Sequence, residues 1–335
     1  MIEGHFVIDM QHHYIPLEAL KFVGKTSEYD YATSLSRFKK AYSVMTDIEA
    51  DLAFMDAAGI DAAILSTGSF TPNGYEFCRE CNTGYSKAVR QYPEKFKGLI
   101  HVYPRDNAAG NRDEIKRGVE ELGLFGLALV SSCGEITADS PLMDHLYESA
   151  VAYDMPVYIH PTIRTNLWGG DRYDMYTTIS REYDIAKAYM ETLFGVIPRF
   201  PELKVIVAHF GGGLPTLKGR LLAWHQPEYL PIPPESRRQG LSIEEAKEFG
   251  AYDDFESRGK NFLFDSAGLG GWLPVIKSAF ETLGADHICF GSDYPYELNK
   301  PAYTKKALVQ MTTLNVCAED KEKFFGGNLK KVFRF

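Results

Sequence analysis

The chain has 335 residues, of which 45% are hydrophobic and 13% aromatic, and its formal net charge is −9. This apolar content excludes a disordered chain and predicts a sizeable core. The excess of acidic residues gives no positive field, so we expect a small-molecule partner rather than nucleic acid or an anionic membrane. At about 150 residues per domain the length suggests two domains, although a single α/β barrel also reaches this size.

The five cysteines and the N-terminus both indicate an intracellular protein. The cysteines are odd in number and scattered, unlike those of a disulfide-stapled secreted domain. The N-terminus lacks the basic and long apolar regions of a signal peptide, and no run approaches 18 apolar residues. We therefore expect a cytoplasmic protein without a membrane span. Cys78 and Cys81 form a C-x-x-C pair, but no second pair completes a zinc site.

Short apolar runs rich in Val, Ile and Phe recur along the chain, and stretches with helical spacing follow them. Runs without polar alternation are typical of parallel strands covered by helices on both faces. Eight β-then-α units predict an α/β fold, a single (β/α)8 TIM barrel over residues 1–335. The runs are 6–10, 61–66, 98–103, 126–130, 156–160, 204–209, 261–265 and 287–293.

Two helix starts have recognisable capping signals. Thr46 to Glu49 reads as a capping box ahead of a helix that ends at Gly59. Ser140 followed by Pro141 predicts an N-cap with proline in the first turn.

Three connections that follow strands are longer than a βα loop needs. They cover residues 17–45, 161–182 and 226–260, and they are rich in aromatic residues or proline. Because such loops gather at the C-terminal face of a barrel, where active sites lie, we expect them to cap a pocket. For the third loop, a contact between subunits is an equally good interpretation.

Histidine, aspartate and glutamine residues finish four of the predicted strands. The carboxyl ends of parallel barrel strands meet at one pole, so these side chains are expected to converge. A single histidine at a strand end is usually structural, but four such ends together favour a metal site. The residues are Gln11, His12 and His13 after the first run, His160 after the fifth, His209 after the sixth and Asp293 after the eighth.

Several longer motifs carry a resemblance to a known family. The chain resembles the amidohydrolase superfamily, in its amidohydrolase 2 branch, which contains aminocarboxymuconate semialdehyde, γ-resorcylate and 5-carboxyvanillate decarboxylases. The resemblance extends over nearly the whole chain. Its motifs are Met55-Asp-Ala-Ala-Gly-Ile-Asp61, Pro93-Glu-Lys-Phe96, His160-Pro161, Phe200-Pro-Glu-Leu-Lys204, Ala208-His-Phe-Gly-Gly-Gly-Leu-Pro215, Phe290-Gly-Ser-Asp-Tyr-Pro295 and Gly327-Asn-Leu-Lys-Lys-Val-Phe333.

The resemblance implies a metal site. It makes His13, His160 and Asp293 metal ligands and His209 an acid–base residue beside the metal, and it implies a homodimer. Where the family has histidine or glutamate, this chain has Gln11, whose amide oxygen is a weaker, uncharged donor. We assign Gln11 as a further ligand because strand alternation points it, but not His12, to the side of His13. The set suits zinc, with manganese as the alternative.

The leading hypothesis is a metal-dependent, non-oxidative decarboxylase of an aromatic or unsaturated carboxylic acid. Asp293 or His209 would handle the proton. Arg164, four residues beyond His160, is placed to pair with the substrate carboxylate. Trp168 and Tyr294 are predicted substrate contacts, although packing in the core is an equally good interpretation of Tyr294. Arg172, Arg181 and Arg220 are weaker candidates for the same role as Arg164, and a position on the solvated surface is the better interpretation of each.

Two alternatives stay open. The same ligands would also suit a hydrolase of an amide, a lactone or a carbon–carbon bond that uses a metal-bound hydroxide. The second is a barrel that has lost its metal and survives as a binding protein. Only Gln11 supports that interpretation.

Overall fold

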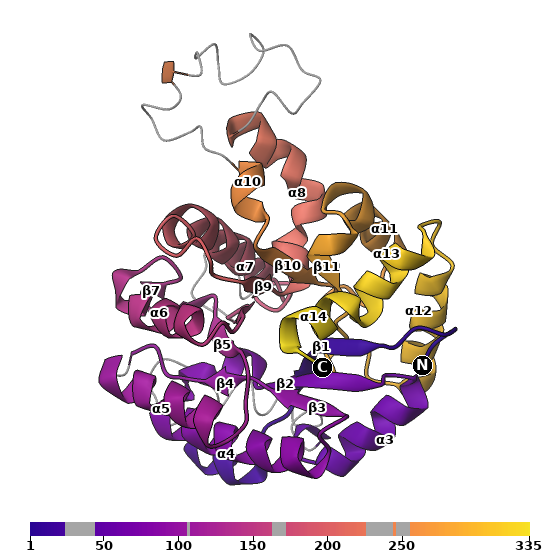
Figure 1. Ribbon diagram of the computed structural model, residues 1–335. Helices are drawn as coiled ribbons and strands as arrows, with labels where there is room; N and C mark the ends of the chain where they lie inside the picture. The colour runs from indigo at the N-terminus through magenta and orange to yellow at the C-terminus, as the bar shows by residue number, and fades with distance from the viewer. Residues whose placement is uncertain (24–43, 106–107, 163–171, 226–243, 246–254) are drawn as a thin grey trace.

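The structure, a computed structural model, describes residues 1–23, 44–105, 108–162, 172–225, 244–245 and 255–335. At its centre lies a ring of parallel strands surrounded by helices (Figure 1). Two hydrogen-bonded sheets make up the ring, in the orders β1-β2-β3 and β11-β10-β9-β8-β5-β4. The strands are β1 Ile8–His13, β2 Ala62–Ser66, β3 Phe96–Gly98, β4 Ile100–His101, β5 Leu127–Val130, β8 Val157–His160, β9 Val205–Val207, β10 Phe262–Asp265 and β11 Ile288–Cys289.

Backbone hydrogen bonds close these two sheets into one barrel. β3 and β4 are consecutive parts of one strand, interrupted only at Leu99. On the other side, Met10 N donates to Phe290 O and His13 N donates to Tyr294 O, each at 3.0 Å, which joins β1 to the segment that follows β11. The predicted (β/α)8 barrel is therefore confirmed, and each of the eight predicted runs overlaps a strand of the ring.

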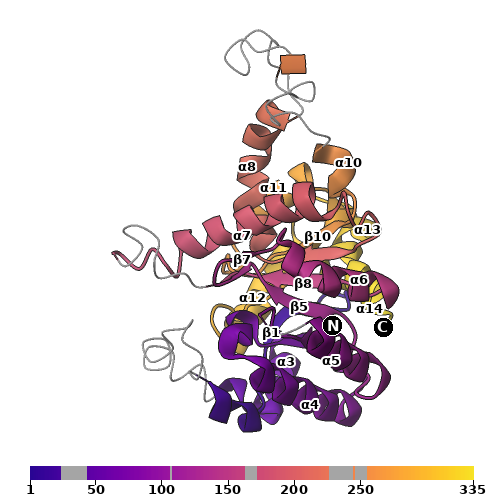
Figure 2. The same cartoon turned by 90° about the vertical axis from the view of Figure 1, so that its left-hand side faces the viewer.

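Helices surround the barrel on all sides. Figure 2 shows α3, α4 and α5 below the strands and α7, α8 and α11 above them. A short hairpin of β6 (Ser132–Cys133) and β7 (Ile136–Thr137) lies outside the ring. The helices are α3 Ile48–Ala58, α4 Tyr75–Gln91, α5 Ala108–Glu120, α6 Asp144–Ala152, α7 Ile179–Glu191, α8 His209–His225, α10 Phe255–Gly259, α11 Leu273–Thr282, α12 Pro301–Thr312, α13 Ala318–Glu322 and α14 Asn328–Phe333. Short 3-10 or π segments are η1 Leu17–Phe22, η2 Gly68–Asn73, η3 Pro141–Met143, η4 Thr192–Val196, η8 Ala285–His287 and η9 Lys323–Gly327.

The apolar core has two layers. The larger one lies between the strands and the helices, and the smaller one fills the barrel with residues such as Ile8, Met10 and Ile206. Leu329 and Phe333 of α14 belong to the inner layer. A Cβ on Gly126, which precedes β5, would lie 3.2 Å from Phe333. The C-terminal helix therefore closes the barrel at the amino ends of its strands, opposite the predicted site.

The two capping predictions have different outcomes. Ser140 accepts a hydrogen bond from Leu142 N at 3.3 Å and precedes Pro141, as predicted. The predicted cap at Thr46 is wrong by one residue. Asp47 caps α3 by accepting from Glu49 N and Ala50 N, because a carboxylate at this position reaches both amides of the first turn.

Most of the three predicted cap segments falls on residues 24–43, 163–171, 226–243 and 246–254, which lie outside the described residues. Within these segments the structure describes η1, the start of α7 at Ile179 and α10. The second segment, predicted to extend to residue 182, therefore already contains the first turn of a helix. A cap over the barrel remains a prediction. None of the described helices is long and apolar enough to cross a membrane.

Candidate metal centre

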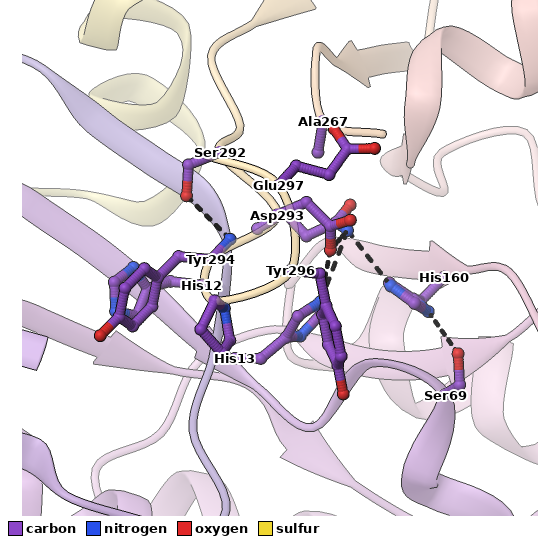
Figure 3. Close-up of polar contacts among 12 residues, drawn as sticks. His12, His13, Ser69, His160, Ala267, Ser292, Asp293, Tyr294, Tyr296 and Glu297 are labelled. Atoms are coloured by element: carbon purple, nitrogen blue, oxygen red, sulfur yellow. Dashed lines mark hydrogen bonds and ion pairs between the residues drawn. The ribbon is translucent and has the colours of Figure 1, made fainter. Parts of the chain in front are cut away.

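The side chains predicted to converge do so at the carboxyl ends of the strands. His13 ends β1, His160 ends β8, His209 follows β9 and Asp293 follows β11. All four are buried. Figure 3 shows His13 and His160, which end two strands, and Asp293, which follows a third, pointing toward one another.

His13, His160 and Asp293 form a compact group of potential ligands. Each offers one ligand atom, and these atoms all lie within 4.8 Å of one another. His13 Nε2 is 3.0 Å from Asp293 Oδ1. The other carboxylate oxygen, Asp293 Oδ2, is buried and has no hydrogen-bond partner among the described residues. Two imidazoles and a carboxylate with an unsatisfied oxygen fit a divalent metal ion.

The second ring nitrogen of His160 fixes the orientation of this ligand. His160 Nδ1 lies 2.9 Å from the backbone oxygen of Pro161 and 3.3 Å from Ser69 Oγ. Because Nδ1 donates to this carbonyl, the lone pair of Nε2 is free to face the other ligands. Burial and the neighbouring His13 and Arg181 charges lower the pKa of His160 well below its usual value, so the ring is neutral, as a ligand must be.

Gln11 lies at the centre of the cluster. Its Nε2 donates to Asp293 Oδ1 at 2.8 Å and is 3.3 Å from Nε2 of both His160 and His209. The pairing register of β1 shifts between Asp9 and His12, and this bulge places both Met10 and Gln11 inside the barrel. His12 points the other way, as alternation predicts: its Nδ1 is 3.0 Å from Asp9 Oδ2.

His209 is held by a close contact with its ring and by a partner at one nitrogen. Its Nδ1 is 2.7 Å from Glu182 Oε1, so Nε2 faces the cluster. A Cβ on Gly268 would lie 2.5 Å from the His209 ring, which shows how closely that backbone packs against it. Burial alone would lower the pKa of His209, but the Glu182 carboxylate raises it above its usual value. A histidine so oriented is suited to holding or delivering a proton.

Asp265 and Tyr158 connect this histidine to Gln11. Asp265 Oδ1 accepts from His209 N at 3.1 Å and from Ala267 N at 3.0 Å. Tyr158 places its hydroxyl 2.9 Å from Asp265 Oδ2 and 2.7 Å from Gln11 Oε1. Burial raises the pKa of Asp265 to about 6.

Arg181, in the first turn of α7, corrects the expectation that it is a solvated surface residue. It is only partly exposed, and within the part of the chain that the structure describes its buried Nε has no hydrogen-bond partner. Burial alone would raise the pKa of Asp293, but the hydrogen bond with His13 and the charge of Arg181 lower it. Arg181 is thus close enough to the cluster to act on it electrostatically. Its helix begins earlier than the sequence indicates, which is why its position was not foreseen.

Of the three predicted substrate contacts, Arg164 and Trp168 lie outside the described residues. Tyr294 requires a correction. Its ring is 3% exposed and stacks on Phe54 at 4.0 Å and on His12 at 4.7 Å, so it packs between β1 and α3. The tyrosine on the ligand side is Tyr296, whose ring centroid is 5.6 Å from that of His13 (Figure 3).

The sequence interpretation missed Tyr158, Glu182 and Asp265. Asp265 ends the seventh predicted run, so the rule that identified the other strand-end residues applies to it as well. Tyr158 is two residues before His160 on the same strand, and alternation places it on the same side. Glu182 lies on a helix after an irregular segment, and nothing in its local sequence connects it to His209.

This fold and cluster define a class: (β/α)8 barrel proteins that gather metal-ligating side chains at the carboxyl ends of the strands. The amidohydrolase family model matches residues 8–335. The chain therefore belongs to the amidohydrolase 2 family, as its motifs indicated.

Individual relatives are distant but match most of the chain. The chain is 24% identical to γ-resorcylate decarboxylase from Polaromonas sp. over 299 residues, which cover 84% of this chain and 85% of that one. The 5-carboxyvanillate decarboxylase structure from Sphingomonas paucimobilis superposes with a TM-score of 0.82 at 22% identity, covering 99% and 100% of the two chains. The enzyme of that name from Novosphingobium aromaticivorans, in complex with manganese and 4-hydroxy-3-methoxy-5-nitrobenzoic acid, gives 0.76 at 23% identity, covering 99% and 97%. These two structures support the fold.

Proposed function

We propose that this protein is a metal-dependent, non-oxidative decarboxylase of an aromatic or unsaturated carboxylic acid. The observation that carries the proposal is the buried group of His13, His160 and Asp293 with His209 beside it. The similarity to decarboxylases such as γ-resorcylate decarboxylase supports the reaction type.

The metal would be held by His13, His160 and Asp293. A bound divalent ion supplies positive charge that orients a carboxylate and its neighbouring oxygen. We propose manganese first, because the Novosphingobium relative was solved with manganese. No finding supports the expected preference for zinc, which becomes the competitor to test.

The reaction requires one proton and no oxidant. The bond between the carboxylate carbon and the ring or vinylic carbon breaks, the electron pair stays on that second carbon, and a proton joins it as carbon dioxide leaves. We assign the proton to His209, because Glu182 holds its Nδ1 and leaves Nε2 facing the ligands. Asp293 is committed to the ligand group.

Arg181 and Tyr296 would bind the substrate. Arg181 has a buried donor with no partner in the described ranges, and its charge already acts on Asp293. A guanidinium in this position suits a carboxylate. Tyr296 presents a flat ring on the His13 side, which suits an aromatic or planar acid.

Product analysis tests the proposal. The protein is loaded with Mn²⁺ or Zn²⁺ and incubated with γ-resorcylate or 5-carboxyvanillate in water enriched in oxygen-18. The expected result is release of carbon dioxide and a decarboxylated product that contains no oxygen-18, with no reaction in His160→Ala, which lacks a ligand. Oxygen-18 in a carboxylate released from an amide or lactone incubated in the same way would instead establish the hydrolase. Bound metal without any conversion of the planar acids would contradict the proposed reaction.

A further inference from the structure

The hydroxyl of Tyr158 has more acceptors around it than protons to donate. It carries one hydrogen, yet it lies 2.7 Å from Gln11 Oε1 and 2.9 Å from Asp265 Oδ2. In this amide orientation both neighbours are acceptors, so one of them goes without a hydrogen bond. All three side chains are buried, so water does not compensate.

Asp265 is a stronger acceptor for the Tyr158 hydroxyl hydrogen than Gln11 is. Its Oδ1 already accepts two backbone N–H groups, from His209 and Ala267, as an ionised carboxylate does. Its pKa of about 6 leaves it mostly charged at neutral pH. Since charge-assisted hydrogen bonds are the stronger kind, the Tyr158 hydroxyl donates to Asp265 and offers its oxygen lone pair to Gln11.

Rotating the Gln11 amide by 180° about its terminal bond gives the Tyr158 oxygen a hydrogen-bond donor. The amide nitrogen then donates to Tyr158, and the amide oxygen takes the position among Nε2 of His160, Nε2 of His209 and Oδ1 of Asp293. Without a metal, the opposite orientation is favoured, because the nitrogen donates to Asp293. With a cation among these ligands, an oxygen is required instead.

We propose that Tyr158, held by Asp265, turns the Gln11 amide oxygen toward the metal and so makes Gln11 an additional ligand, with Tyr158 as its positioning residue. The inference rests on the metal site of the proposed function. It explains how a chain with glutamine in place of histidine or glutamate retains a metal centre. Because the Gln11 amide is neutral, Asp293 is the one charged ligand of the set. A divalent ion bound there would keep a net positive charge, which attracts an anionic substrate.

The test measures the dissociation constant for Mn²⁺ by competition with a chromogenic chelator, a readout independent of turnover. Four proteins form a double-mutant cycle: the wild type, Tyr158→Phe, Gln11→Glu and the double variant. Loss of a residue that orients a ligand typically weakens metal binding about 10–100-fold, and we expect this for Tyr158→Phe. In the Gln11→Glu background we expect a loss of about threefold or less, because either carboxylate oxygen can coordinate.

Two further variants serve as a control and as a replacement in case Tyr158→Phe does not fold. Tyr147→Phe removes an equally buried hydroxyl, which donates to the backbone oxygen of Ala138 at 2.6 Å, and should leave metal binding unchanged. If Tyr158→Phe fails to fold, Gln11→Ala takes its place and is expected to weaken Mn²⁺ binding.

Several results would overturn the inference. One is an equal loss from Tyr158→Phe in both backgrounds, and another is no loss at all. Unchanged or tighter binding by Gln11→Ala would show that the amide is not a ligand. In all these cases the wild type still binds Mn²⁺, so the proposed function stands. If the wild type binds neither Mn²⁺ nor Zn²⁺, the proposed function and this inference both fail.

Discussion

At the scale of single residues, the site separates groups that would hold the metal from one that would handle a proton. His13, His160 and Asp293 each offer an atom to the same small volume. His209 faces that volume as well, but its other nitrogen is engaged by Glu182 at 2.7 Å, an arrangement typical of an acid–base histidine.

Two substitutions test this division. His160→Ala should abolish both metal binding and activity, because it removes a ligand. His209→Asn should keep its metal content while kcat falls by about 10²–10⁴-fold, the usual contribution of a positioned acid–base group. Elemental analysis and steady-state kinetics on the two purified variants make the comparison. If His209→Asn loses its metal, His209 is a ligand and the assignment is wrong.

At the scale of elements, short segments with unusual backbone conformations position the site. From His209 to Gly213 every residue has a positive φ, and so does Asp293. Gly68 and Gly268 let the backbone pass close to His13 and His209, at positions where a Cβ would lie 2.6 Å and 2.5 Å from the imidazole rings. Glycine is needed there for both its conformation and its small size.

Two glycines near the site allow the effect of backbone conformation to be measured separately from the effect of small size. Gly268 and Gly270 both have positive φ, at +76° and +55°, but a Cβ on Gly270 would meet no atom within 4 Å. Each change to alanine should cost about 1 kcal/mol of stability through the backbone. Only Gly268→Ala should also lower kcat, by displacing His209, and we expect a loss of at least about tenfold. Equal kcat values in the two variants would show that the contact does not matter.

The sequence predicted the strands and the strand-end residues because both depend on local patterns. Apolar runs without alternation mark buried parallel strands, and the residue that ends such a run lies at the catalytic pole. The environment of Gln11 could not be predicted in this way. It depends on a bulge in β1 and on Tyr158, which is close only after the barrel has closed. Tyr294 was ambiguous because a strand-end tyrosine has the same local sequence whether it faces a ligand or Phe54.

At the scale of the whole molecule, the barrel is closed at the pole opposite the site by its own C-terminal helix. Phe333 of α14 is 2% exposed and lies in the inner core layer, whereas Phe335, two residues later, is 38% exposed. A chain whose last helix fills the barrel depends on that helix for stability.

Replacing each of these two phenylalanines with alanine measures how much α14 contributes to the stability of the protein. Phe333→Ala should lower the free energy of unfolding by about 3–5 kcal/mol, as expected for a large buried side chain. Phe335→Ala should change it by about 0.5 kcal/mol or less. Urea denaturation followed by circular dichroism gives both values. Similar midpoints for the two variants would mean that α14 contributes little to the core.

Anomalous diffraction at the manganese edge, from one crystal of the metal-loaded protein, tests the assignment of the metal ligands most directly. We expect a single strong anomalous peak within about 2.5 Å of His13 Nε2, His160 Nε2 and an oxygen of Asp293. A crystal loaded in the same way that shows no peak among these atoms, or a peak elsewhere in the barrel, would contradict the assignment.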